Sequence, residues 1–221
     1  MTDPAWPDYR REVFGDPYEV WHTGADFGVL MERYRAGGDA VLDMLELGMA
    51  ANDELAARGL EVIARSASPG SAEARRSATP VRVERMLRAA SSSARGGFLV
   101  RVAEALFALT GDPALGDAIA SALVQTPWTL QRMDAAIALV AFEPTRRIVD
   151  ALATGVRADE YLLRYHSAGS LSHLAGGPRD VSTVPELAEL IAAPRSGRPR
   201  RSDRKRWAAA ADRLAAPFAG L

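Results

Sequence analysis

The hydrophobic positions of the chain repeat one short pattern: an alanine, a leucine three residues later, and a large apolar residue three residues after that. The four copies are Ala57/Leu60/Ile63, Ala103/Leu106/Leu109, Ala136/Leu139/Phe142 and Ala168/Leu171/Leu174. Because residues three apart lie on one face of a helix, each copy predicts one amphipathic helix. The last three copies begin 33 and 32 residues apart, and a period of that size is typical of stacked helical pairs in an α-solenoid.

The residues between the apolar stretches predict about ten helices. Gly37-Gly38 ends one helix, Asp39 caps the next, and Asn52 caps a third. Gly111-Asp112-Pro113 has the glycine, cap and proline order of a tight turn between helices. Because no segment alternates apolar and polar residues for long enough to form a strand, the sequence predicts an all-α fold.

The chain is expected to form a single repeat domain with distinct ends. Residues 26–192 carry the helical periodicity, while residues 1–25 are rich in proline, glycine and aromatic side chains and predict an irregular N-terminal cap. Small and polar residues over 66–79 predict a mobile loop. Residues 194–206 predict a basic linker, followed by a terminal helix over 207–216.

The composition excludes several classes of site. With 48% hydrophobic and 25% charged residues, a packed core is expected, and the net charge of −1 gives no sign of a basic nucleic-acid-binding domain. The absence of cysteine excludes disulfides, thiolate metal sites and a cysteine nucleophile. The longest apolar run, Ala135 to Phe142, is too short for a membrane span, and the N-terminus lacks a signal-peptide pattern, so we expect a cytoplasmic protein.

Three stretches resemble the second helix of HEAT repeats. The closest is Leu-Leu-Arg-Tyr-His-Ser-Ala-Gly-Ser-Leu-Ser-His-Leu-Ala-Gly at 162–176, followed by Leu130–Ala136 and Val100–Leu106. The likeness covers residues 80–192, and more weakly 39–65. It implies an α-α superhelix of about five helical pairs. HEAT-like folds in bacteria include adaptors, toxin immunity proteins, lyase and maturation factors, and alkylpurine DNA glycosylases, so the fold by itself does not choose a function.

Aligning the last three copies on their alanines produces two columns of polar positions. The first column holds Leu99, Arg132 and Arg164, and the second holds Arg101, Asp134 and His166. One interpretation is a polar ladder that grips a partner on the concave face. The other is an arginine and aspartate ladder that joins adjacent repeats, and bidentate arginine–carboxylate geometry serves either purpose.

Trp128 adds an aromatic candidate to this set. It follows Pro127 at a predicted helix start, one turn before Arg132. An exposed tryptophan beside an arginine is typical of a binding hot spot, although a tryptophan packed between repeats would fit the same pattern. The candidate binding residues are Trp128, Arg132, Asp134, Arg164 and His166.

No metal or cofactor site is expected. His166 and His173 are seven residues apart, whereas helical metal sites use a spacing of four with further ligands, and His22 is the one other histidine. The basic run offers a possible contact with nucleic acid or an acidic protein, although a solvated linker explains it as well. The residues that would make this contact are Arg198, Arg200, Arg201, Arg204, Lys205 and Arg206.

The favoured function is a non-catalytic protein-interaction module, an adaptor or an immunity-type protein, that binds one partner on its concave face. One alternative is a HEAT-like alkylpurine DNA glycosylase or other nucleic-acid-binding protein, for which Trp128, Asp134 and Arg164 are the nearest approximation to a catalytic set. Another is a maturation or lyase factor for a peptide or chromophore, which predicts a deep apolar pocket.

Overall fold

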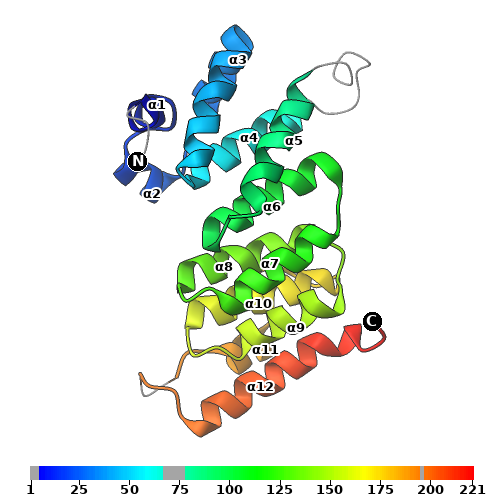
Figure 1. Ribbon diagram of the computed structural model, residues 1–221. Coiled ribbons are helices and arrows are strands. Elements are labelled where there is room, and N and C mark those ends of the chain that lie inside the picture. Colours follow the sequence, from blue (N-terminus) through cyan, green and yellow to red (C-terminus); the bar gives the residue numbers. More distant parts are fainter. Residues whose placement is uncertain (1–4, 67–77, 195–196) are drawn as a thin grey trace. The chain divides into compact units, whose positions relative to one another are not determined.

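The computed structural model describes residues 5–66, 78–194 and 197–221, and these form helices and connecting turns without a strand (Figure 1). The all-α class predicted from the sequence is confirmed. The chain divides into two compact units, Met1–Asp112 and Pro113–Leu221. In the described part of the chain, no helix is both long and apolar enough to cross a membrane.

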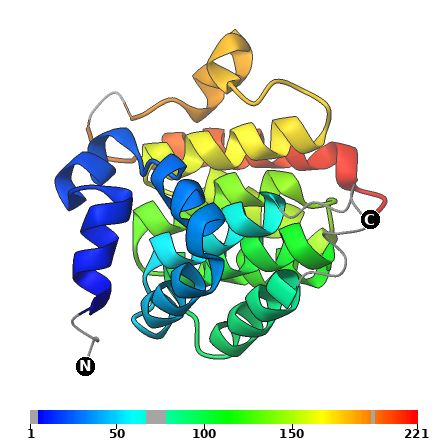
Figure 2. The same ribbon diagram turned by 90° about the horizontal axis from the view of Figure 1, so that it is seen from above.

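The first unit consists of two short N-terminal helices followed by two helical pairs. Its helices are α1 (Ala5–Phe14), α2 (Pro17–Thr23), α3 (Gly28–Ala50), α4 (Glu54–Ser66), α5 (Ala78–Ser91) and α6 (Gly96–Thr110). Helix α3 packs on α4, and α5 packs on α6. Successive pairs stack through α3 against α5 and α4 against α6, while α1 lies on α3 (Figure 2).

The second unit has the same two-row arrangement. Its α-helices are α7 (Ala114–Gln125), α8 (Thr129–Ala138), α9 (Arg146–Val156), α10 (Tyr161–Leu174), α11 (Pro185–Ile191) and α12 (Arg201–Ala215). Short 3-10 helices are η2 (Leu139–Ala141), η3 (Val181–Thr183) and η4 (Ala216–Phe218). Helix α9 packs between α7 and α12 in one row, and α10 contacts α8 and α11 in the other.

The repeated apolar pattern forms the cores of both units. Ten of its twelve side chains are buried, and only Leu109 and Leu174 remain half-exposed. Each helix therefore buries its apolar face against its pair partner and the next helix in its row. Paired helices are what the sequence period predicts, while a continuous HEAT-like superhelix stays a prediction.

The prediction of an irregular segment over residues 1–25 is wrong, because the described part of it forms α1 and α2. Trp6, Val13 and Phe14 are at most 3% exposed and give α1 an apolar face. Proline is compatible with both helices, since the N–H groups of a first helical turn have no intrahelical acceptor. Pro17 is the first residue of α2, and Asp16 caps that helix by accepting from the Tyr18 N–H at 2.9 Å.

Asp53, and not Asn52 as predicted, caps helix α4. Asn52 has a left-handed backbone, with φ of 55°, while Asp53 Oδ1 accepts from the Leu55 N–H at 2.8 Å. The other carboxylate oxygen accepts from Trp6 Nε1 at 3.2 Å and from Arg10 Nε at 2.8 Å. One carboxylate therefore caps α4 and fastens α1 beside it.

Two other boundaries differ from the sequence expectations, and one expectation stays untested. Gly37 interrupts α3 as a kink instead of ending it, with φ −159° and ψ 62°. The last helix begins at Arg201 instead of residue 207, because Asp203 accepts from the Arg200 N–H at 2.9 Å and starts the helix within the predicted linker. The predicted mobile loop over 66–79 falls almost entirely on 67–77, outside the described residues.

Gly48 is required for the close packing of α1 on α3. A Cβ atom at this position would lie 2.6 Å from Trp6 Cζ2 and 2.6 Å from Ala56 Cβ. We expect Gly48→Ala to lower the free energy of unfolding by about 2 kcal/mol, because an overpacked core has to shift. Gly220→Ala is the control, since nothing lies within 4 Å of its added Cβ. Urea denaturation measures both, and equal stability of the two variants would contradict the close approach.

Candidate functional site

Arg164 is a buried structural residue of the second unit. Its side chain is 0% exposed. The guanidinium donates from Nε to the Ile191 carbonyl at 2.8 Å, from Nη1 to the Ala158 carbonyl at 2.6 Å and from Nη2 to the Ala192 carbonyl at 3.4 Å. Its central carbon lies 3.6 Å from the centroid of the Trp207 ring, which is cation–π geometry.

Two further side chains complete this arrangement at the end of α11. Arg206 donates to the carbonyls of Glu189 at 2.8 Å and Ala192 at 3.1 Å, and Trp207 Nε1 donates to Ala192 at 3.1 Å. The last carbonyls of a helix have no intrahelical partner and carry partial negative charge. Side chains from α10 and α12 therefore satisfy the C-terminus of α11, and we call this set the α11 clamp.

Because Arg164 belongs to the clamp, it does not lie on the predicted docking surface. Burial and the nearby charge of Arg206 lower the pKa of Arg164 to about 10, partly offset by Asp159, so the group stays charged at neutral pH. Since no part of its side chain reaches solvent, Arg164 lies beneath the surface to which the sequence analysis assigned it. Its role matches the joining interpretation, with backbone carbonyls as acceptors in place of an aspartate.

Arg132, Asp134 and His166 are half-exposed on α8 and α10. Arg132 Nε donates to the Leu123 carbonyl at 3.0 Å. Burial lowers the pKa of His166, with Arg179 lowering it further and Asp134 raising it. Asp134 of α8 therefore lies close enough to His166 of α10 to interact with it electrostatically. Arg101, from the same predicted column, lies in the first unit and pairs with Glu104 at 2.8 Å.

Large apolar side chains are exposed where α8 and α10 begin. Trp128 is 70% exposed, Leu130 60%, Leu162 51% and Tyr161 43%. Trp128 precedes the first residue of α8, and Tyr161 is the first residue of α10. We call these four residues the α8/α10 patch. Its exposure shows that the Trp128 ring does not pack between repeats, which was the alternative interpretation of this residue.

The register of α8 and α10 brings the two halves of the patch together. Short turns join α8 to α9 and α9 to α10, and each reverses the chain direction, so α8 and α10 run parallel (Figure 1). Ser170 Oγ donates to the Ala136 carbonyl at 2.7 Å, which aligns each α8 residue with one 34 positions later. Trp128 and Leu162 therefore lie at the same end of adjacent helices. Sequence analysis found Trp128 but missed the other three, although their apolar character off the core face was a usable signal.

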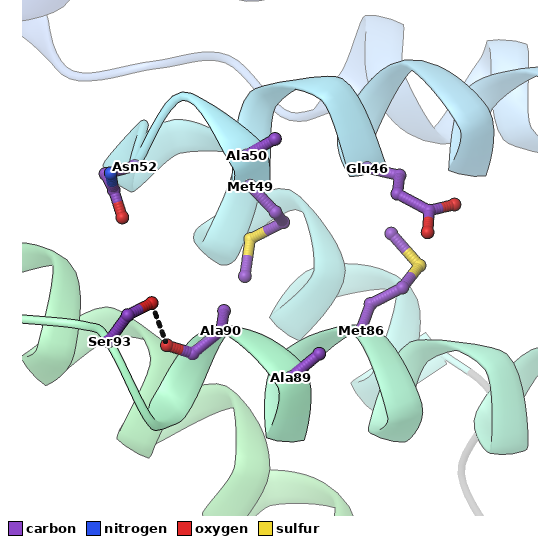
Figure 3. Close-up of a pocket in the computed structure, with 8 residues that line it drawn as sticks. All are labelled: Glu46, Met49, Ala50, Asn52, Met86, Ala89, Ala90 and Ser93. Atoms are coloured by element: carbon purple, nitrogen blue, oxygen red, sulfur yellow. Dashed lines mark hydrogen bonds between the residues drawn. The ribbon is translucent and has the colours of Figure 1, made fainter.

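Each unit also has a hollow between two helices of one row. In the first unit, a groove of about 310 Å³ separates the second half of α3 from α5, and the Met49 and Met86 side chains point into it from opposite sides (Figure 3). The groove is lined by Glu46, Met49, Ala50, Asn52, Met86, Ala89, Ala90 and Ser93. In the second unit, a hollow of about 500 Å³ lies between α7 and α9 and is lined by residues including Val124, Arg146 and Arg147.

Two residues of the basic run, Arg204 and Arg206, form contacts within the second unit. Arg204 forms a two-pronged ion pair with Asp159 at 3.0 and 2.6 Å, and Arg206 belongs to the α11 clamp. Among the described residues of the run, Arg198, Arg200, Arg201 and Lys205 are also exposed. Within the described ranges, no three histidine, aspartate or glutamate side chains are placed to hold a metal ion.

Comparison with protein-family models, with curated proteins and with solved structures gives no match for this chain. The functional argument therefore rests on the geometry of the two units, and the HEAT-like relationship stays a prediction.

Loss of the Arg164 side chain is expected to destabilise the second unit strongly. Arg164→Met keeps apolar bulk but leaves the Ile191 and Ala158 carbonyls without this donor, so we expect the free energy of unfolding to fall by about 3 kcal/mol. Arg132→Met removes one bond at a half-exposed site and should cost about 1 kcal/mol. Urea denaturation compares them, and an equal loss in both would contradict the clamp.

His166 is expected to titrate below its ordinary pKa of 6.5. Because the folded state disfavours the charged ring, the stability it contributes is complete above about pH 6.5 and is lost as the pH falls through the lowered pKa. The Hε1 resonance followed by NMR measures the midpoint. Arg179→Gln should raise it and Asp134→Asn should lower it further. A midpoint at or above 6.5 in the wild type would contradict the burial of this ring.

Proposed function

We propose that the protein is a non-catalytic protein-interaction module that binds a partner protein through the α8/α10 patch. The observation that carries this proposal is the grouping of four exposed large apolar side chains at one end of two adjacent helices. Monomeric proteins expose apolar residues singly, whereas contiguous groups mark interaction sites. Tryptophan and tyrosine, two of the four residues of the patch, are also enriched in binding interfaces and hot spots.

The frame beneath the patch supports the same function. The Arg164 guanidinium lies 5.8 Å from the Tyr161 ring centroid, so the α11 clamp lies directly under the start of α10. A surface that is already ordered loses little conformational entropy when it binds. Tyrosine and tryptophan add to this advantage, because their large rings have only two side-chain torsions to fix.

The chemistry of the patch defines the partner surface it fits. The apolar patch requires apolar or aromatic side chains on the partner. Arg132, Asp134 and His166 each follow a patch residue by four positions on the same helix, so they can offer both signs of charge to a polar rim. An adaptor and an immunity-type protein are the two roles that use such a surface without catalysis. The nucleic-acid and maturation-factor alternatives have no comparable group of side chains in their favour among the described residues.

The test begins with identification of the partner in the native host. A photo-crosslinking residue at Leu130 captures the partner, and the binding of the purified pair is then measured by calorimetry. We expect Trp128→Ala to weaken binding by about 30-fold, as truncation of a hot spot does. Tyr18→Ala is the matched control, because Tyr18 is an aromatic residue of the first unit with 71% exposure, and it should bind as the wild type does.

Two results would contradict this proposal. One is equal affinity of the Trp128→Ala variant and the wild type. The other is sequence-tolerant DNA binding that weakens steeply with salt and is lost when Arg200, Arg201 and Lys205 are neutralised, which would indicate a nucleic-acid-binding function instead.

A further inference from the structure

The α3/α5 groove of the first unit has the features of a second docking site, independent of the α8/α10 patch. We propose that it binds a basic amphipathic helix of a partner protein. An apolar side chain of that helix packs into the groove over Met49 and Met86, which are 6% and 5% exposed, and its lysine or arginine side chains lie along the acidic row of α3.

The groove is apolar at its centre. Met49 and Met86 approach from opposite helices, and Ala50, Ala89 and Ala90 line the space between the helices (Figure 3). Small side chains at these positions leave the hollow open, because alanine does not reach the facing helix. Methionine is unbranched and polarisable, so it adapts its shape to an inserted apolar side chain. The volume of about 310 Å³ is at the lower end of ligand pockets, and its open form suits the side chains of a bound segment.

A row of acidic side chains on α3 continues beyond the Glu46 end of the groove. Asp39, Asp43 and Glu46 follow one another at helical spacing along one face of α3. Arg82 of α5 contacts all three, at 3.5 Å from Asp39, in a short ion pair with Asp43, and at 3.2 Å from Glu46. One guanidinium therefore serves three carboxylates, whose side chains are 96%, 68% and 58% exposed.

The negative charge of these side chains favours a positively charged partner. The first unit as a whole has 17 acidic and 13 basic residues, so its net charge adds to the negative potential at this row. A basic segment is attracted to it, while an acidic segment or a nucleic acid is repelled. Exposed carboxylates also remain hydrated until the partner arrives, so they act mainly on the rate and selectivity of binding.

The polar groups at the two ends of the groove predict the orientation of the bound helix. Glu46 lies at one end, and Asn52 and Ser93 lie at the other (Figure 3). Ser93 Oγ donates to the Ala90 carbonyl at 3.3 Å, while the Asn52 side chain is exposed and offers both a donor and an acceptor. A bound helix would place its cationic residues toward Glu46 and a helix end, with its free backbone groups, toward Asn52.

The experiment uses the full chain and two fluorescein-labelled peptides. Each is about 18 residues long, which is enough for a stable helix, and each has leucine on one face. The basic peptide has lysine and arginine on the other face, and the acidic peptide has glutamate there. Fluorescence anisotropy should give a Kd of about 10 µM for the basic peptide and binding at least about tenfold weaker for the acidic one.

Variants distinguish the groove from unspecific attraction by charge. Ala90→Leu fills the groove without changing the charge, and we expect it to raise the Kd of the basic peptide by about tenfold. Ala209→Leu makes the same change at an exposed position of α12 and should have no effect. The double variant Asp43→Asn/Glu46→Gln should reduce both the affinity and its salt dependence. Circular dichroism confirms that each variant is folded.

Three outcomes would overturn the proposal: equal binding of the two peptides, an unchanged Kd in Ala90→Leu, or no saturable binding of either peptide. A concentration-dependent dimer in sedimentation that Ala90→Leu abolishes would also overturn it, because the occupant would then be a second copy of this chain. The Trp128→Ala variant should bind the basic peptide as the wild type does. The proposal for the groove can therefore be wrong while the proposal for the α8/α10 patch is right, and the reverse.

Discussion

The second unit depends on one set of interactions: side chains of the neighbouring helices satisfy the C-terminal carbonyls of α11, and the bond to Ile191 is buried. A seven-residue helix, Pro185–Ile191, has few intrahelical hydrogen bonds compared with its free ends, so its stability comes from tertiary contacts. Arg164 from α10 and Arg206 with Trp207 from α12 supply the donors. The guanidinium of Arg164 donates to the Ala158 carbonyl before α10 and to the Ile191 and Ala192 carbonyls at the end of α11. It therefore joins α10 to α11, and it stacks on Trp207 of α12.

Both units use polar side chains to fasten a short helix to the stacked pairs. In the second unit these are Arg164, Arg206 and Trp207, which hold α11. In the first unit Asp53 caps α4 and binds two residues of α1. The fastened helices cover apolar faces that a terminal pair would otherwise expose, as the ends of helical repeats require. The α8/α10 patch stays exposed at the starts of these two helices, and its exposure is the physical basis of the proposed interaction function.

The core of both units was predictable from the sequence, because the apolar spacing of a helix is local. Ala136, Leu139 and Phe142 were assigned to the core from their spacing and are buried. A joining role for Arg164 was one of the two interpretations of the sequence, but its partners were not predictable, since the carbonyls of Ile191 and Ala192 lie far along the chain and no residue pattern marks them. Alignment on the alanines placed Arg164 beside Arg132, although one is fully buried and the other half-exposed. The same limit applies to Asp53, whose partners Trp6 and Arg10 lie in a segment whose prolines argued against a helix.

Hydrogen exchange followed by mass spectrometry tests the central claim most directly, by comparing the wild type with Arg164→Met. If the α11 clamp holds the second unit together, amide exchange should accelerate in α10, α11 and α12 as one cooperative group, including the turn that carries Tyr161 and Leu162, while α3 to α6 keep their wild-type rates. Acceleration confined to α11, or unchanged exchange throughout, would show that these helices hold their positions without Arg164 and would contradict the account.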